Sequence, residues 1–204
     1  MKTTRMLLCA LLVALPAIAL AQRPGETNPP PSSTTTPKEP SGETAKLSQV
    51  DTQAIAHQHA VNQLEIKLGK MAQKNGTAKV KTYGQQLTSD HMKADRDMTT
   101  FAKKHGLTTI PADQAMTDQD KKQQADNESK LRAMKGADFD KEFLNMMVTD
   151  HEREVTKAEA DIGIVDNKDL ANHLRDNVKP MLQRHADDAR KLQQEGATTS
   201  MKEH

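Results

Sequence analysis

Between residues 48 and 196, large apolar residues recur at alternating spacings of three and four positions, the pattern of amphipathic helices. This pattern predicts four long helices of about 25 residues and contains no run typical of a strand. The long helices are expected over residues 48–75, 77–105, 138–165 and 168–196, with a short polar helix over 117–135. Pro180 is expected to bend the last helix, because proline removes a backbone donor. The sequence therefore predicts an all-α, up-and-down four-helix bundle with one extra short helix.

The two ends of the chain depart from this pattern. Residues 1–21 have the features of an export signal, because Lys2 and Arg5 precede an apolar run and Ala19-Leu20-Ala21 fits an A-x-A cleavage site. The next segment holds six of the nine prolines and almost no large apolar residue, which predicts disorder. The predicted organisation is a signal peptide over residues 1–21, a disordered linker over 22–45, one helical domain over 46–196 and a disordered tail over 197–204.

Composition and charge exclude several classes of function. Cys9 is the only cysteine and lies inside the predicted signal, so the mature protein would have no thiolate ligand. Cleavage would remove Lys2 and Arg5 from the 29 Lys and Arg, leaving 27 against 28 Asp and Glu. A net charge near −1 gives no reason to expect nucleic acid or an anionic membrane as a partner. After the signal no apolar run approaches the ~20 residues of a transmembrane helix, so we expect an exported protein that is soluble in the periplasm or secreted.

Three histidines, His91, His151 and His185, lie in the middle of three apolar stripes. Imidazole is the commonest metal ligand and is costly to bury without a partner. His151 lies about 16 residues before the last interhelical connection and His185 about 18 after it, so their heights differ by only ~3 Å. Glu65 borders the stripe of the first helix, one turn from the level of His91. The candidate metal site is therefore Glu65, His91, His151 and His185, one residue from each long helix.

Two interpretations of these four residues are open. Three imidazoles and one carboxylate without sulfur suit one transition-metal ion, either iron, zinc, copper or manganese. Alternatively, the histidines hydrogen-bond one another and nearby carboxylates and are only structural. Met147 and Met181 each precede a candidate histidine by four residues, a pairing that suits copper, but core packing explains both methionines better.

The aspartates that precede two of the histidines are expected on the outer side of their helices. Neighbouring positions on a helix point in different directions, so a residue before a core-facing histidine does not itself face the core. Asp90 and Asp150 are therefore expected to face solvent or to pair with Lys93 and Arg153, and the alternative that these carboxylates fix the imidazole tautomers stays open.

An ordered set of short motifs carries a resemblance to a known family. The motifs are Glu65-x-x-Leu68-Gly69-x-Met71-Ala72, Thr88-Ser89-Asp90-His91, Gly136-x-x-Phe139-Asp140-x-x-Phe143, Asp150-His151 and Pro180-Met181-Leu182-x-x-His185. Together they resemble a bacterial exported family, domain-of-unknown-function family 4142, often labelled "predicted outer membrane protein". The resemblance covers nearly all of residues 47–194. It implies a ferritin-like four-helix bundle with an extra short helix and a location in the cell envelope.

One departure from the ferritin-like pattern bears on the metal. Di-iron proteins of that fold carry Glu-x-x-His on two helices and a further Glu on two others. Here Thr88, Val148 and Leu182 stand three residues before the three histidines. A site for a single metal ion, or no metal site, is therefore more consistent with the sequence than a carboxylate-bridged di-iron centre.

The sequence supports two hypotheses of function. In the first, an exported bundle holds one transition-metal ion for storage, buffering or stress protection. In the second, a non-enzymatic envelope protein acts through its surface on a partner protein, and its core histidines are only structural. Because no nucleophile constellation and no phosphate-binding loop is present, both hypotheses lean against an enzyme.

Overall fold

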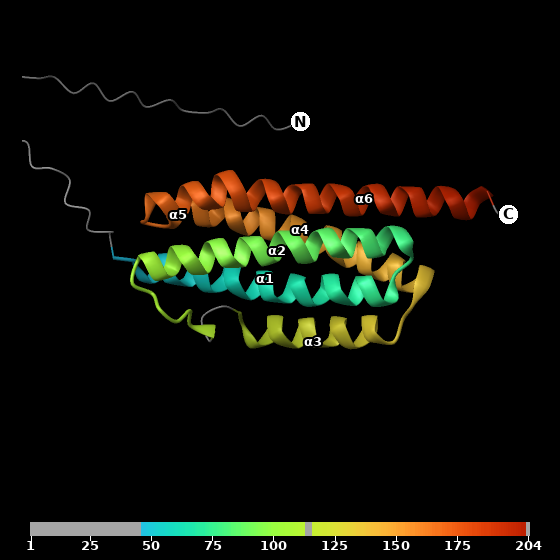
Figure 1. Cartoon of the computed structure of the whole chain (residues 1–204), viewed down its shortest axis with the longest axis horizontal. Helices are drawn as coiled ribbons and strands as arrows, with labels where there is room; N and C mark the ends of the chain where they lie inside the picture. Colours follow the sequence, from blue (N-terminus) through green and yellow to red (C-terminus); the bar gives the residue numbers. More distant parts are fainter. Residues whose placement is uncertain (1–45, 113–115, 203–204) are drawn as a thin grey trace, which may run out of the picture. The chain divides into compact units, whose positions relative to one another are not determined.

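The computed structural model of the protein describes residues 46–112 and 116–202, with side chains as far as residue 196. The predicted signal peptide and linker, residues 1–45, lie outside the described residues. Within the described ranges no residue lies in a strand, which confirms the all-α class. The elements are α1 (Gln49–Asn75), α2 (Ala78–Lys104), α3 (Asp118–Arg132), α4 (Gly136–Ile164), α5 (Lys168–His173), the π-helical turn η2 (Leu174–Val178) and α6 (Lys179–Lys202) (Figure 1).

The long helical segments pack as two pairs. Helix α1 lies beside α2, and α4 lies beside the continuous segment formed by α5, η2 and α6, as Figure 1 shows. The pairs meet where α1 contacts α4 and where α2 contacts α6. The shorter α3 runs along the outside of α1 and also contacts α4. These positions agree with the four long helices and the short polar helix expected from the sequence.

Two glycines allow α1 and α2 to approach closely. A Cβ on Gly69 would lie 2.7 Å from the carbonyl oxygen of Gly84, and a Cβ on Gly84 would lie 2.6 Å from that of Gly69. Both distances are far inside van der Waals contact, so alanine at either position would push the helices apart. Because α1 and α2 lie so close together, even short side chains on one helix can contact the other helix.

The start of α1 is tied to the connection between α4 and α5. Ser48 and Asp51 form a capping box, in which each side chain accepts a hydrogen bond from the backbone N–H of the other. Asp51 Oδ1 also accepts from the backbone N–H groups of Asp166 and Asn167, at 3.0 Å each. Since Asp51 is only 1% exposed, this buried carboxylate fixes one end of the two helix pairs relative to each other.

The core has two hydrophobic clusters with a polar layer between them. The first cluster contains Leu68, Leu87, Phe139, Phe143, Met147 and Ala189 among others. The second contains Ile55, Met98, Leu170, Leu174 and Leu182 among others. On each of the four long segments the positions between these clusters are occupied by buried polar residues, namely Gln58, Asn62 and Glu65 on α1, His91 on α2, His151 on α4 and His185 on α6. The polar layer, defined by these six residues, is therefore built into the middle of the core.

Two local features of the last helical segment concern its proline and its C-terminal end. Pro180 follows a π-helical turn, in which the N–H of Lys179 donates to the carbonyl oxygen of Leu174. The wider turn accommodates the proline ring and its missing N–H without a break in the helix. Helix α6 also continues to Lys202, past the start of the predicted disordered tail. Gly196 adopts no left-handed conformation, so it weakens the helix without ending it.

Candidate metal centre

The polar layer brings His91, His151 and His185 together from α2, α4 and α6. Their ring centroids lie 5.1 Å apart for His91 and His185, 5.3 Å for His151 and His185, and 5.8 Å for His91 and His151. All three side chains are buried, with at most 1% of the residue exposed. One nitrogen of each ring lies within 4.8 Å of one nitrogen of each of the other two. The spacing agrees with the nearly equal heights expected from the sequence.

Each histidine is held from outside the triangle by one hydrogen bond. His91 Nδ1 lies 2.9 Å from Asn62 Oδ1, His151 Nδ1 lies 2.9 Å from the carbonyl oxygen of Met147, and His185 Nε2 lies 2.9 Å from Asp90 Oδ2. An amide oxygen, a carbonyl and a carboxylate can only accept, so each of these ring nitrogens donates its proton. The hydrogen bonds therefore fix both the orientation and the tautomer of all three rings.

The remaining ring nitrogens face one another across the triangle. These are Nε2 of His91, Nε2 of His151 and Nδ1 of His185, and all three are buried without a hydrogen-bond partner. In a neutral imidazole whose other nitrogen donates, this nitrogen carries a lone pair. One nitrogen of each ring lies within 4.8 Å of one nitrogen of each other ring, and none of the three unpartnered nitrogens has a proton to donate. Such an arrangement is unfavourable for a structural network but suits a cation.

Burial keeps the three imidazoles in the neutral form that binds metal. Burial lowers the pKa of His91 well below its usual value, and the nearby His151 and His185 lower this pKa further. Burial lowers the pKa of His151 to about 3. Burial also lowers the pKa of His185, although the hydrogen bond to Asp90 opposes this shift. At neutral pH the three rings are uncharged and their inward lone pairs are available.

Glu65, the fourth residue of the predicted site, is buried beside the triangle but outside the group of close donor atoms. It follows Asn62 by three residues, so it lies one turn along the same face of α1. Its Oε2 has no hydrogen-bond partner. Burial raises the pKa of Glu65 to about 8, and the negative charges of Asp150 and Glu154 contribute to this shift. The structure thus brings three of the four predicted residues together, while Glu65 is a buried, neutral acid with one oxygen that has no hydrogen-bond partner.

A comparison with known protein families identifies a match for this chain. The profile of the family "Domain of unknown function (DUF4142)" matches residues 36–192. The chain belongs to this family. No curated protein and no solved structure matches the chain. The DUF4142 match includes α1 to α5 and most of α6, so it contains the whole polar layer.

Asp90 is the residue of this DUF4142 domain whose role differs most from the sequence expectation. Asp150 does pair with Arg153, at 2.8 Å, as expected. Asp90 instead accepts from both His185 Nε2 and Arg184, at 2.9 and 2.8 Å, while Lys93 pairs with Asp97. The pairing expected with Lys93 was wrong because the side of α2 that carries Asp90 packs against α6, where Arg184 and His185 reach this partly exposed carboxylate.

Asn62 is a residue of the centre that the sequence prediction missed. A detectable signal exists, because Gln58, Asn62 and Glu65 recur at spacings of four and three and are all buried. This spacing marks a polar stripe on a core-facing side of α1. A polar stripe in phase with the histidines of the other helices predicts hydrogen-bond partners for them.

Met147 and Met181 both pack against the hydrophobic clusters of the DUF4142 domain. Met147 packs in the first hydrophobic cluster, and its backbone carbonyl holds His151. Met181 packs at the edge of the second cluster. Both residues therefore support the interpretation as core packing over a thioether ligand for copper.

Proposed function

We propose that this DUF4142 protein is an exported, ferritin-like four-helix bundle that binds one transition-metal ion through His91, His151 and His185, with Glu65 as the fourth ligand. The observation that carries the proposal is the convergence of three buried, unpartnered imidazole nitrogens whose opposite nitrogens are all held by acceptors. Iron, zinc, copper or manganese each fit a set of nitrogen and oxygen ligands.

The geometry needs only a small adjustment to bind an ion. Nitrogens at about 2.1 Å from a tetrahedral ion lie about 3.4 Å from one another. One nitrogen of each ring lies within 4.8 Å of one nitrogen of each other ring. Small rotations about the side-chain dihedral angles would therefore bring the three nitrogens to the separation that an ion requires. The required decrease in the nitrogen–nitrogen separation, from at most 4.8 Å to about 3.4 Å, is small.

Charge balance favours Glu65 as the fourth ligand. A divalent ion among neutral imidazoles would bring two positive charges into the core, which is costly without compensation. The charge of Asp90 behind His185 is shared with Arg184, so Glu65 is the residue of the polar layer that supplies a new negative charge on losing its proton. This charge offsets part of the charge of the bound ion.

Binding for storage, buffering or stress protection is favoured over catalysis. The two cavities described below are not lined by any of the three histidines. A substrate placed in either cavity would therefore not contact a ligand of the metal directly.

The proposed location rests on the sequence of residues 1–45, which has the features of an export signal followed by a linker. Among the described residues no helix is long and apolar enough to cross a membrane. We therefore propose a periplasmic protein or one attached to the outer membrane through other contacts.

Elemental analysis of the purified protein tests the proposal. We expect about one transition-metal ion per chain in the wild type and none after replacement of His91, His151 and His185 by alanine. His59→Ala is the matched control, because His59 pairs with Asp95 at the surface of α1 and α2. Equal metal content in the wild type and the triple variant would overturn the proposal and favour the alternative, in which the histidines are structural and the protein acts through its surface.

A further inference from the structure

A cavity lies between α1, α3 and α4. It has a volume of about 520 Å³, and its wall includes His57 and Leu64 from α1, Asp150 and Glu154 from α4, and Gln124 and Asn127 from α3. Asp150 and Glu154 stand one residue before and three residues after His151, and Leu64 precedes Glu65. The inner wall of this cavity is therefore made by the sequence neighbours of two proposed ligands.

A second cavity, of about 280 Å³, lies on the opposite side of the polar layer, between α2, η2 and α6. Asp90 and Arg184 line it, and the carboxylate of Asp90 accepts hydrogen bonds from both Arg184 and His185. The nitrogen that His185 presents to this side is already engaged as a donor. On the side of α1 and α4, Asp150 bonds to Arg153 and Glu154 bonds to His57, while the Oε2 of the buried Glu65 has no hydrogen-bond partner.

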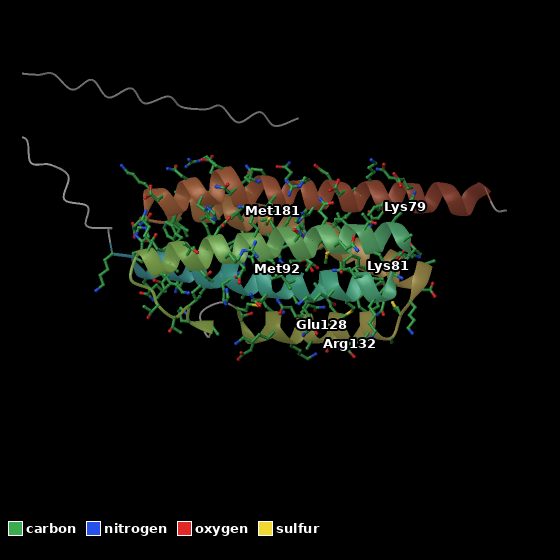
Figure 2. The ribbon with its side chains drawn as sticks, viewed as in Figure 1. Lys79, Lys81, Met92, Glu128, Arg132 and Met181 are labelled. Carbon is green, nitrogen blue, oxygen red and sulfur yellow. The ribbon has the colours of Figure 1, made fainter. Side chains whose placement is uncertain are left out.

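Helix α3 forms a weakly attached cover over the larger cavity. Leu131 is its only buried residue. Polar contacts attach the rest, including the ion pairs Lys67 to Glu128 at 2.6 Å and Lys130 to Glu142 at 2.6 Å, and Figure 2 labels Glu128 on this helix. Exposed ion pairs contribute about 0–1 kcal/mol each, so local opening of α3 costs far less than unfolding the four long segments.

We propose that metal ions reach the histidine triangle through the cavity beneath α3, where the carboxylates of Asp150 and Glu154 receive the ion and Glu65 passes it to His151. This inference rests on the proposed function, since it describes the route to the same site. The ion exchanges its bound water for carboxylate oxygens one at a time along this path and ends at three nitrogens and Glu65. The cavity on the side of Asp90 remains closed during uptake.

Two matched substitutions at asparagine test the route. Asn127→Trp fills the cavity beneath α3, and Asn177→Trp fills the cavity beside Asp90. Co²⁺ is added to the full-length protein stripped of metal, and its visible absorbance in a nitrogen-rich site is followed by stopped flow. We expect Asn127→Trp to slow uptake about tenfold or more, with unchanged equilibrium binding, and Asn177→Trp to take up Co²⁺ at the wild-type rate.

Further variants keep the test independent of a folding defect. Gln124→Trp fills the same cavity from a different position and should give the same slow uptake. Glu154→Gln should slow uptake by about threefold through loss of charge, whereas Asp97→Asn in the other cavity should not. Circular dichroism and the unfolding midpoint of each variant should match those of the wild type.

The outcomes separate the route from the proposed function. Wild-type uptake rates in both Asn127→Trp and Gln124→Trp would overturn the route alone, as would slow uptake confined to Asn177→Trp. A wild-type protein that takes up no Co²⁺ at equilibrium would overturn the proposed function and the route together.

Discussion

The polar layer and the first hydrophobic cluster are equally buried, but different contacts stabilise them. In the cluster, Phe143 packs against Phe139 and Tyr83 with ring centroids 5.3 and 6.2 Å away, and these side chains gain from burial itself. In the layer each histidine has one hydrogen bond and one buried nitrogen without a partner. Burial stabilises the cluster, whereas in the metal-free protein it costs stability in the layer. A costly layer in the middle of a core indicates a function that burial alone does not explain.

The largest contrast between the two regions should appear as a dependence of stability on pH. His151 has a pKa of about 3 in the folded protein against 6.5 for the free side chain, so the unfolded chain binds a proton that the folded one does not. Stability should therefore be full above pH 6.5 and decline as the pH falls from 6.5 towards 3, by about 5 kcal/mol from His151 alone. His91 and His185 add to the loss, since burial lowers both pKa values. Urea unfolding of the metal-free protein across this range measures the effect.

Glu65 should produce a dependence of the opposite sign. Its folded pKa of about 8 exceeds 4.5, so the stability that it contributes is full below pH 4.5 and is lost as the pH rises through 8. Glu65→Gln in the metal-free protein removes this loss, because glutamine does not ionise. The variant should match the wild type at pH 4.5 and exceed its stability at pH 9. If the wild type and Glu65→Gln gave parallel curves between pH 5 and 9, the description of the layer would be wrong.

Phe143→Ala should destabilise the hydrophobic cluster without any such dependence on pH. The side chain is fully buried, so its truncation removes apolar contacts and leaves a cavity, at a cost of about 3–5 kcal/mol. The loss should be constant between pH 5 and 8, as measured by the same urea titration. A loss that changed with pH would show that the cluster and the layer are energetically coupled.

The same contrast explains how much of the molecule its sequence predicts. The hydrophobic clusters follow from apolar residues repeating every three or four positions, so the helices and their core-facing sides are predicted correctly. The histidines are found because each interrupts such a stripe. Their partners are not found, because Asn62 and Asp90 act across pairs of helices, and the distance between two helices depends on packing such as that of Gly69 and Gly84. The π-helical turn before Pro180 is missed because sequence periodicity does not distinguish a bend from a wider turn.

The smallest expected effect concerns Asp90, which accepts a hydrogen bond from His185 on the side away from the other two histidines. Asp90→Asn keeps the size of the side chain but removes its charge, so the tautomer and the basicity of His185 are no longer fixed as strongly. We expect metal affinity to fall about 10- to 100-fold, measured by competition with a chelator of known affinity. Asp95→Asn is the matched control, because Asp95 bonds to His59 away from the triangle and its loss should leave affinity unchanged. Equal affinity in both variants would mean that Asp90 only joins α2 to α6, and that the orientation of His185 depends on packing alone.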